Sequence, residues 1–496
     1  MMEVRNKGYR MKRRILTVVV LYKMTPLDSV SYRSLLQSAA RLSSEALDLG
    51  IILYDNTPTS PGPHDLPPNV RYIPSSSNSG LATAYNLALK AALDEGYDWL
   101  LTLDQDTDLP VDTLALFLDA LTEIEQHPHV AAVVPKIRAS GRIVSPNYFA
   151  AGAWPRWFPA TFTGISEKDV YAFNSGSLLR ATALRQVGGY SPWFWLDNSD
   201  SHIYRQLSKF GKRVYIAGKL EVDHDFSMLN LQERVSPDRY KTILLSESAF
   251  WDSEMNALAG MERTAKLIGR FAKHLLHNDD PALRKLTVGA ICARLFLTRR
   301  QRLEKWRSLM EADQGPLVVS EASAVHPRVS ACVAFYNSDR YVKAQLDSIV
   351  SELTSSDEII VVDDCSTDGT IAAVRQVVQV WKDSGVAPKI TLIQHGKHQG
   401  KASAWRNALR STTGDIILLS NEDLWHVGKL HKVLDVFIAN ARVRCLRAVF
   451  NSLDDEDLSL HQGRTHTSEP SKTLLHRQFH GSTIAIRSSQ IEYVLR

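Results

Sequence analysis

The strongest constraint on the fold is a pattern of short apolar segments and helical stretches that occurs twice in the chain. The first copy runs from the apolar segment 15–22 to the acidic residue Asp104, and the second starts at Val329 and ends near residue 419. Within each copy, apolar runs of strand length alternate with segments of helical periodicity, and the connections are short. The alternation predicts doubly wound α/β sheets, and the repeat predicts a duplication at the scale of a domain.

The length of the chain and a break in its composition predict how it is divided. At 496 residues the chain is too long for one ordinary domain. A polar, weakly patterned stretch at residues 311–327 separates the two copies. We therefore predict a first α/β domain at 1–260, a basic helical linker at 261–327 and a second, incomplete α/β domain at 328–496.

Composition and charge argue against several classes of protein. With 44% hydrophobic and 23% charged residues the chain has a globular composition, and its net charge of +4 is too small to indicate nucleic-acid binding. No stretch reaches the roughly 18 apolar residues that a membrane-spanning helix needs. Four scattered cysteines without a C-x-x-C pair argue against a zinc site or a disulfide framework, and for a reducing compartment. These features predict a cytoplasmic protein.

The segment 261–310 is helical in pattern and strongly basic. Lysines and arginines far outnumber acids there, and leucine and phenylalanine side chains are interleaved with them. A basic amphipathic helix of this kind can lie on an anionic membrane surface, which would place the protein at the periphery of the inner membrane. The alternative is a helical linker whose apolar stripe packs on the domains while its charges are solvated. Both interpretations stay open.

An apolar run from Leu100 ends abruptly in two carboxylates, Asp104 and Asp106. In a doubly wound sheet, ligands bind at the carboxyl ends of the strands, where these residues and Asp55 are expected. Paired carboxylates at such a position can hold a divalent cation against a diphosphate. The alternative is a strand followed by an ordinary polar turn.

Aromatic residues crowd two segments of the first half. Residues 147–162 are predicted to be irregular, and Trp193, Phe194 and Trp195 precede a predicted helix. Flat rings of this kind can stack on the faces of sugar rings. Packing in a core or in a lid is the competing interpretation.

Several motifs in order give both halves a resemblance to a known family. The second half contains Val362-Asp363-Asp364-Cys365-Ser366-Thr367-Asp368-Gly369-Thr370. The first half contains Asp55-Asn56-Thr57, the segment 78–86, Leu103-Asp104-Gln105-Asp106-Thr107, Asn174-Ser175-Gly176-Ser177 and Gly188-Gly189-Tyr190. Both halves resemble family 2 glycosyltransferases, which are inverting, depend on nucleotide sugars and have the GT-A fold. The first half is closer to bacterial rhamnosyltransferases, and the resemblance covers nearly the whole chain outside the linker.

The resemblance implies a reaction and its partners. The donor is a dTDP- or UDP-sugar, with rhamnose favoured, and the cofactor is Mg²⁺ or Mn²⁺. The acceptor is a hydroxyl of a bacterial surface glycan such as O-antigen (the lipopolysaccharide polymer) or capsule, either free or lipid-linked.

The resemblance also implies a set of donor-binding residues. They are Tyr22, Asp55, Asn56, Gly80, Asn86 and Asp104. Asp55 can accept the imide N–H of a uracil or thymine base. Gly80 lets the backbone pass close to the nucleotide before a helix whose N-terminus favours anions, although an ordinary glycine at a helix start is equally consistent.

The metal ligands implied by the resemblance are Asp104, Asp106 and His224. The implied catalytic base is Asp200, with Asp197 as its neighbour, and such proton transfer contributes a factor on the order of 10²–10⁴ in rate. The related enzymes usually carry Glu where this chain has His202, so the choice between Asp197 and Asp200 stays open. Read without the family, this pair is more typical of a helix N-cap.

The second half departs from the family pattern. Asn421-Glu422-Asp423 stands in place of Asp-Gln-Asp, which leaves Asp363, Asp364 and Asp423 as doubtful site residues. Three alternatives remain for this half. It is a non-catalytic carbohydrate-binding or scaffolding module, part of a truncated sequence, or the second active site of a bifunctional glycan polymerase.

Overall fold

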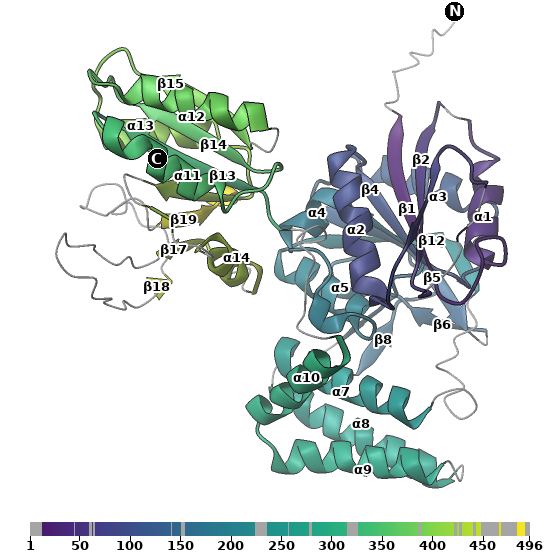
Figure 1. Ribbon diagram of the computed structural model, residues 1–496. Helices are drawn as coiled ribbons and strands as arrows, with labels where there is room; N and C mark the ends of the chain where they lie inside the picture. Colours follow the sequence, from purple (N-terminus) through teal and green to yellow (C-terminus); the bar gives the residue numbers. More distant parts are fainter. Residues whose placement is uncertain are drawn as a thin grey trace, which may run out of the picture. The chain divides into compact units, whose positions relative to one another are not determined.

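The first sheet is built around strand β1 (Arg13–Leu21), in which residues 15–21 are all buried and only Thr17 among them is polar (Figure 1). The computed structural model describes residues 12–43, 45–58, 62, 65–139, 141–149, 154–223, 236–255, 257–276, 280–314, 326–384, 388–420, 424–425, 429–439, 443–447, 466–467 and 484–491. The chain divides into two compact units, Met1–Val325 and His326–Arg496. In the described residues, none of the helices combines the length and the apolar character needed to cross a membrane.

The sheet of the first unit has the strand order β3-β2-β1-β4-β11-β5-β12-β9, and β6 pairs with β5. The strands are β1 (Arg13–Leu21), β2 (Leu47–Asp55), β3 (Val70–Pro74), β4 (Trp99–Asp104), β5 (Val130–Ala139), β6 (Arg142–Ser145), β9 (Gly164–Ile165), β11 (Ser177–Arg180) and β12 (Arg213–Asp223). Strands β3, β2, β1 and β4 run parallel, and β11 lies antiparallel between β4 and β5. Continuous apolar runs suit the central strands because helices cover both faces.

Two hydrophobic cores lie on opposite faces of this sheet. Helices α1 (Val30–Ala39) and α3 (Thr113–Glu123) contribute to one core. The other core contains side chains of α2 (Gly80–Asp94), α4 (Ala181–Gln186) and α5 (Ser199–Lys209). The predicted doubly wound α/β architecture is therefore confirmed (Figure 1).

A small second sheet, with the order β10-β7-β8, lies in the aromatic segment of the first unit. Its strands are β7 (Asn147–Phe149), β8 (Pro155–Trp157) and β10 (Val170–Tyr171). Strand β7 is antiparallel to both neighbours. The prediction of an irregular 147–162 segment was wrong for its described part, since these short strands lack the long alternation that marks a strand in a sequence.

In the described part of the first unit, four helices follow the sheet. They are α7 (Pro237–Glu254), α8 (Ala257–Leu276), α9 (Pro281–Phe296) and α10 (Arg299–Gln314). Trp306 and Met310 of α10 are buried in the core that contains α2 and α5. Most of the segment that the sequence predicted as a linker is thus packed on the first unit, because α10 returns to its core.

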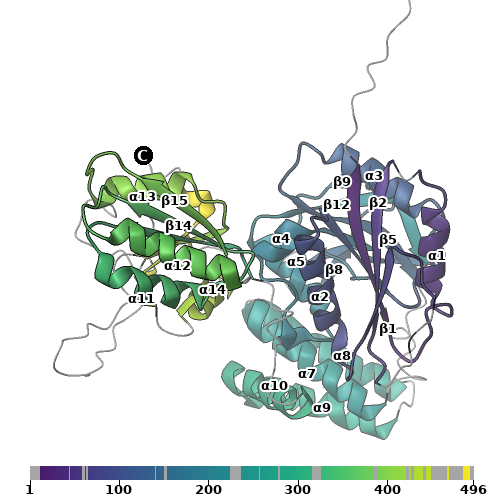
Figure 2. The same ribbon diagram turned by 45° about the horizontal axis from the view of Figure 1, so that its top comes forward.

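The second unit repeats the topology of the first. Its sheet order is β15-β14-β13-β16-β19-β17-β18, which matches β3-β2-β1-β4-β11-β5-β6 strand by strand. The strands are β13 (Val329–Phe335), β14 (Glu358–Asp363), β15 (Lys389–Gln394), β16 (Ile416–Ser420), β17 (Cys445–Arg447), β18 (His466–Thr467) and β19 (Ile484–Arg487). Helices α11 (Asp339–Val350), α12 (Thr370–Ser384) and α14 (Lys429–Ala439) contribute to the core on one face and α13 (Lys401–Arg410) to that on the other (Figure 2). The predicted duplication is confirmed.

Candidate functional site

The carboxyl ends of three parallel strands bring the predicted donor residues to one edge of the first sheet. Leu21, the last residue of β1, is in register with Asp55 on β2. On the other side of β1, Val20 is in register with Asp104 on β4. Tyr22 follows β1 directly and is exposed. The sheet therefore holds Asp55, Asp104 and Tyr22 at the same edge, where doubly wound folds bind ligands.

Asp55 is buried at the end of β2 and has defined partners. Its Oδ1 accepts the Thr57 N–H at 2.8 Å, and its Oδ2 accepts the Tyr72 hydroxyl at 2.5 Å. Each carboxylate oxygen has a second lone pair, so the group can still accept a hydrogen bond from a ligand.

Asn56 joins the end of β2 to the start of α2. Its Nδ2 donates to the Gly80 carbonyl at 3.2 Å, and its Oδ1 accepts from the Ser79 N–H at 3.1 Å. Asn56 therefore holds the loop beside Asp55 in place.

The acidic pair after β4 has two different environments. Asp104 is partly buried, and its Oδ1 accepts the Tyr85 hydroxyl at 3.2 Å. Its backbone N–H donates to Ser175 Oγ at 3.1 Å. Asp106 is exposed. One carboxylate is thus fixed by the fold, and the other can adapt to a ligand.

Two serines at the start of α1 hold the backbone of the acidic tip. Ser29 Oγ donates to the Gln105 carbonyl at 2.8 Å, and Ser31 Oγ accepts the Thr107 N–H at 2.8 Å. Both serines are buried. The turn that presents Asp106 is therefore positioned by α1 and not by the strand alone.

Asp200, in the first turn of α5, lies near two buried phenols. Its burial raises its pKa to about 6, although its Oδ1 accepts the Ser201 N–H at 2.6 Å. The pKa values of Tyr85 and Tyr190 are raised, first by burial and also by the charges of Asp104 and Asp200. The two carboxylates are therefore neighbours of the same pair of phenols, whose ring centroids lie 4.9 Å apart, and the Tyr85 hydroxyl donates to Asp104.

Asp197 is committed to an ion pair. Its two carboxylate oxygens accept from the two terminal nitrogens of Arg239 on α7, one of them at 2.6 Å. Its backbone carbonyl accepts the Ser246 hydroxyl at 3.1 Å. Of the two candidate bases, Asp200 is thus the one without a guanidinium partner in the described structure.

His202 occupies the position where the related enzymes carry Glu. Burial lowers its pKa to about 4, so the ring is neutral near pH 7. It stacks on Phe194 with ring centroids 5.0 Å apart. His202 therefore supports the aromatic loop.

Gly80, one of the predicted donor-binding residues, packs against Trp195 of the aromatic loop. Its φ is +77°, and a Cβ on it would come within 2.3 Å of the Trp195 ring. The N–H groups of Leu81 and Ala82 donate to the Trp195 carbonyl at 2.7 and 3.1 Å. The start of α2 is therefore held against the aromatic loop, and nucleotide binding by Gly80 stays a prediction.

Asn86 also has a role that the sequence did not predict. Its Nδ2 donates to the Tyr190 carbonyl at 2.8 Å, and its Oδ1 accepts the Tyr190 N–H at 2.8 Å. This reciprocal pair fixes the turn at Tyr190, and with it one of the two phenols near Asp200. Asn86 is thus a positioning residue in this structure.

His224, the third predicted metal ligand, lies outside the described residues. Its neighbour Asp223 forms an isolated antiparallel bridge with Asp108. Within the described part of the chain, no group of three or more His, Cys, Asp or Glu side chains is arranged to hold a metal ion. Asp104 and Asp106 nevertheless fit a hard cation, which such sites commonly bind through one or two carboxylates plus waters and substrate phosphates.

The second unit has a carboxylate at the matching strand end. Asp363 ends β14, and its register with Phe335 of β13 corresponds to that of Asp55 with Leu21. Asp363 is buried and its Oδ2 accepts the Ser366 N–H at 3.2 Å. Asp423, the other candidate after β16, lies outside the described residues.

Asp364 is surrounded by hydrogen-bond donors. Its oxygens accept the N–H groups of Gln399 at 2.9 Å and Gly400 at 2.7 Å. His395 and His398 approach at 2.7 and 2.9 Å. Burial opposes ionisation, but these contacts outweigh it and lower the pKa of Asp364. The hydrogen-bond partners of this carboxylate therefore all come from the second unit itself.

The loop Trp193–Trp195 is held by α10 as well as by α2. Trp306 Nε1 donates to the Trp193 carbonyl at 3.1 Å, and the Arg307 guanidinium lies 5.6 Å from the centroid of the Trp193 ring. The sequence predicted neither this contact of Trp306 nor the pair of Arg239 with Asp197, because both partners come from helices far along the chain.

One family model matches this chain twice, once in each of the two units. The family model described as Glycosyl transferase family 2 matches residues 44–188 and again 330–491. The chain is 28% identical over 113 residues to an Escherichia coli enzyme named UDP-Glc:alpha-D-GlcNAc-diphosphoundecaprenol beta-1,3-glucosyltransferase WfgD, a match that covers 23% of this chain and 42% of that protein. It is 26% identical over 148 residues to an uncharacterised glycosyltransferase of Nostoc, covering 30% and 44%. Each match thus spans less than half of the relative's own length.

A solved structure is also similar. It is a mannosyltransferase from Pyrobaculum calidifontis in complex with GDP-Man and Mn²⁺, with a TM-score of 0.26 and 23% identity. The similarity covers 34% of this chain and 46% of that one.

Proposed function

Because the chain belongs to glycosyl transferase family 2, we propose that its first unit transfers a sugar from a nucleotide-sugar donor to a hydroxyl of a bacterial surface glycan, with inversion. The observation that carries this proposal is the position of two carboxylates beside one pair of packed phenols. Asp104 accepts the Tyr85 hydroxyl at 3.2 Å, the ring centroids of Tyr85 and Tyr190 lie 4.9 Å apart, and Asp200 is close enough for its charge to raise the pKa of both phenols. Asp104 would serve the donor, and Asp200 would serve the acceptor.

The donor would lie along the strand ends. Asp55 would accept the imide N–H of the base, Asp104 would bind the ribose, and Tyr22 and Asn56 would flank the nucleotide. The first donor to test is dTDP-rhamnose, on the motifs of the first half. UDP-glucose is the second, because it is the donor in the name of the Escherichia coli relative.

Asp200 is the proposed catalytic base. The acceptor oxygen attacks the anomeric carbon from the side opposite the diphosphate, and Asp200 takes the hydroxyl proton on a carboxylate oxygen. As the new carbon–oxygen bond forms, the bond to the diphosphate breaks, and the diphosphate leaves with the electron pair. A pKa of about 6 supports this role, since such a carboxylate is ionised at neutral pH yet more basic than an ordinary aspartate.

Asp104 and Asp106 are the proposed ligands of a Mg²⁺ or Mn²⁺ ion, with His224 completing the set. When bound, such an ion supplies positive charge to the departing diphosphate. The exposed Asp106 suits this role because its side chain can adjust to the ion and the phosphates together.

The proposed acceptor is a lipid-linked glycan at the cytoplasmic face of the inner membrane, with peripheral membrane contact through residues 261–310. The second unit is proposed to bind carbohydrate or nucleotide without catalysing transfer. Asp364, whose oxygens are held by four donors within the unit, supports this assignment over a bifunctional polymerase.

Donor turnover by the purified full chain tests the proposal. The protein is incubated with Mn²⁺ and a panel of nucleotide sugars, and release of nucleoside diphosphate is measured. We expect turnover with one donor and an inverted linkage in the product. No turnover with any donor, while the protein still binds nucleotide, would contradict the proposal. Substantial activity left after Asp106→Ala would support the bifunctional alternative instead.

A further inference from the structure

The two outer helices of the first unit present an apolar face that the described structure leaves uncovered. Figure 1 shows α7 nearest to the sheet, α8 beyond it and α9 farthest out. Seven of the sixteen large hydrophobic side chains that are exposed in the described residues lie on α8 and α9. They are Met261, Ile268, Leu275, Leu276, Val288, Leu295 and Phe296. We name these seven side chains the outer apolar face.

Five of these seven side chains are spaced so that they form a line along each helix. Met261, Ile268 and Leu275 follow one another at intervals of seven residues on α8. Val288 and Leu295 show the same interval on α9. Residues seven apart lie on the same side of an α-helix, two turns apart. Each helix therefore presents one line of apolar side chains along its length.

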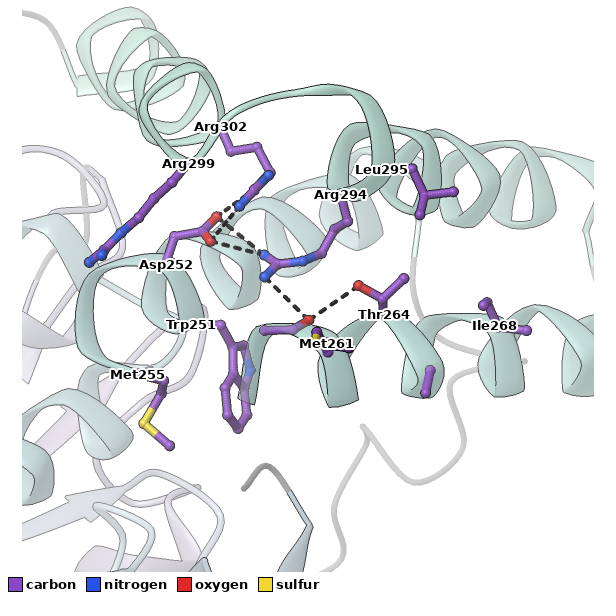
Figure 3. A pocket seen from close by; sticks show the side chains of 12 residues that line it. Trp251, Asp252, Met255, Met261, Thr264, Ile268, Arg294, Leu295, Arg299 and Arg302 are labelled. Atoms are coloured by element: carbon purple, nitrogen blue, oxygen red, sulfur yellow. Dashed lines mark hydrogen bonds and ion pairs between the residues drawn. The ribbon is translucent and has the colours of Figure 1, made fainter. Parts of the chain in front are cut away.

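A groove lined by residues of α7, α8, α9 and α10 lies at one end of these lines. It has a volume of about 640 Å³, and Met261, Ile268 and Leu295 contribute to its lining (Figure 3). Arg299 lies at the same groove (Figure 3). Apolar walls with a guanidinium group beside them favour an occupant that is both apolar and anionic.

The inner sides of the helices are already occupied. Glu247 and Asp252 on α7 pair with arginines of the outer helices: Arg270 lies 3.1 Å from Glu247, and Arg294 lies 3.2 Å from Asp252. Tyr240 of α7 bonds to Thr287 of α9 at 2.8 Å. These partners bind α8 and α9 to α7, and the seven apolar side chains remain exposed beside these contacts.

The charge of the segment is one-sided. Residues 257–310 contain twelve Lys or Arg against four Asp or Glu. Some of the arginines are used in the internal pairs, but Lys273, Lys285, Arg299 and Arg300 are exposed. An apolar face bordered by exposed cations is complementary to an anionic bilayer, whose interface accepts apolar side chains and attracts basic ones.

We propose that the outer apolar face docks the protein on an anionic lipid bilayer, with α8 and α9 lying in the plane of the interface. The inference deepens the proposed transfer to a lipid-linked acceptor and rests on it. A docked bundle would also hold the Trp193–Trp195 loop near the bilayer, because Trp306 of α10 donates to the Trp193 carbonyl and Arg239 of α7 pairs with Asp197, two residues past the loop.

Vesicle flotation of the full chain tests the inference. We expect the protein to float with vesicles of phosphatidylglycerol and phosphatidylethanolamine but not with phosphatidylcholine alone, and roughly 0.5 M salt should weaken the binding. The double substitution Leu276→Glu/Phe296→Glu, at side chains that are 84% and 79% exposed, should weaken binding by at least about a hundredfold.

Two further variants control for charge and for folding. Val380→Glu changes an exposed side chain on α12, which is 61% accessible, and should leave vesicle binding unchanged. Arg299→Gln/Arg300→Gln keeps the apolar residues and should weaken binding by roughly fivefold for each charge removed. All three variants should keep the Tm of the wild type, because the substituted side chains are exposed.

Several results would overturn the docking surface. One is a wild-type chain that does not float with the anionic vesicles. Another is a loss of binding in Val380→Glu that equals the loss in Leu276→Glu/Phe296→Glu. The third is a lower Tm of Leu276→Glu/Phe296→Glu, which would show that protein covers the face. Transfer to a short soluble acceptor separates this inference from the proposed function. Turnover without vesicle binding overturns only the docking surface, whereas vesicle binding without turnover overturns the transfer function.

Discussion

Replacing Asp200 by Asn tests the proposed base with little change in shape. The Ser201 N–H, which donates to Asp200 Oδ1 at 2.6 Å, can donate equally well to an amide oxygen. Loss of the proton acceptor should lower kcat by a factor on the order of 10²–10⁴. Nucleotide affinity should not change, because Asp55 and Asp104 remain intact. A variant with full turnover would refute the assignment of Asp200 as the base.

The pH dependence of the wild type follows from the same residue. With a pKa of about 6, the carboxyl must lose its proton before it can act, so kcat/KM should rise with pH up to about 6 and then level off. The rise should be absent from the residual activity of Asp200→Asn. A profile that falls from pH 5 to pH 7 would contradict the sign of this argument.

The pH dependence of the free energy of unfolding gives a second test of the raised pKa of Asp200. Its pKa rises from 3.8 to about 6 on folding, so the folded protein holds the proton more tightly than the unfolded chain does. At about 1.4 kcal/mol per pH unit, the ionised side chain costs the folded state about 3 kcal/mol. Its contribution is fully present below pH 3.8 and is lost as pH rises through about 6.

Asp200→Asn should therefore be more stable than the wild type at pH 8, by up to about 3 kcal/mol, and equally stable near pH 4. Calorimetric unfolding at both pH values measures the difference, and Asp197→Asn is the control. That control should lose stability at pH 8, because it weakens the pair with Arg239. A less stable Asp200→Asn at pH 8 would refute the argument from burial.

Three further predictions concern the surroundings of the site. Gly80→Ala should lower the free energy of unfolding by about 1–3 kcal/mol, because the φ of Gly80 is +77° and Trp195 leaves no room for a Cβ. In Gly289→Ala on α9 the new Cβ meets nothing within 4 Å, so the free energy of unfolding should rise by about 0.5–1 kcal/mol. Tm values measure both changes. Asp106→Asn should raise the Mn²⁺ concentration for half-maximal activity by about tenfold or more, and an unchanged requirement would rule out a ligand role. Arg239→Ala should lower stability by about 1 kcal/mol, a value kept small by its partial exposure, and a double-mutant cycle with Asp197→Ala measures the coupling.

The sequence predicts the sheets well because strand and helix periods reflect burial. The run that ends at Asp104 is apolar except for Thr102, and the structure buries it between two helical layers. The duplication was equally visible, since each copy needs the same order of apolar runs. Parallel register then brings Asp55 and Asp104 to one edge, so this part of the site follows from topology alone.

Long-range contacts between loops were not predictable in the same way. Gly80 and Trp195 are far apart in the chain, and no local pattern shows that their backbones meet. The partner of Asp197 is likewise an arginine on a distant helix. The basic segment shows a third limit, because composition alone does not separate the arginines that α7 binds from those that stay exposed.

The second unit contains a carboxylate, Asp363, at the strand end that corresponds to Asp55, and nucleotide binding at this position can be tested. Asp363 matches Asp55 in register, yet in the described structure its buried Oδ1 accepts no hydrogen bond. A buried acceptor without a donor costs about 1–3 kcal/mol, so a ligand that donates an N–H there should bind favourably. We expect isothermal titration with UDP or dTDP to give two sites per chain. Asp363→Asn and Asp55→Asn should each remove one site, and only Asp55→Asn should reduce turnover. A single site in the wild type that Asp363→Asn leaves intact would refute nucleotide binding by the second unit.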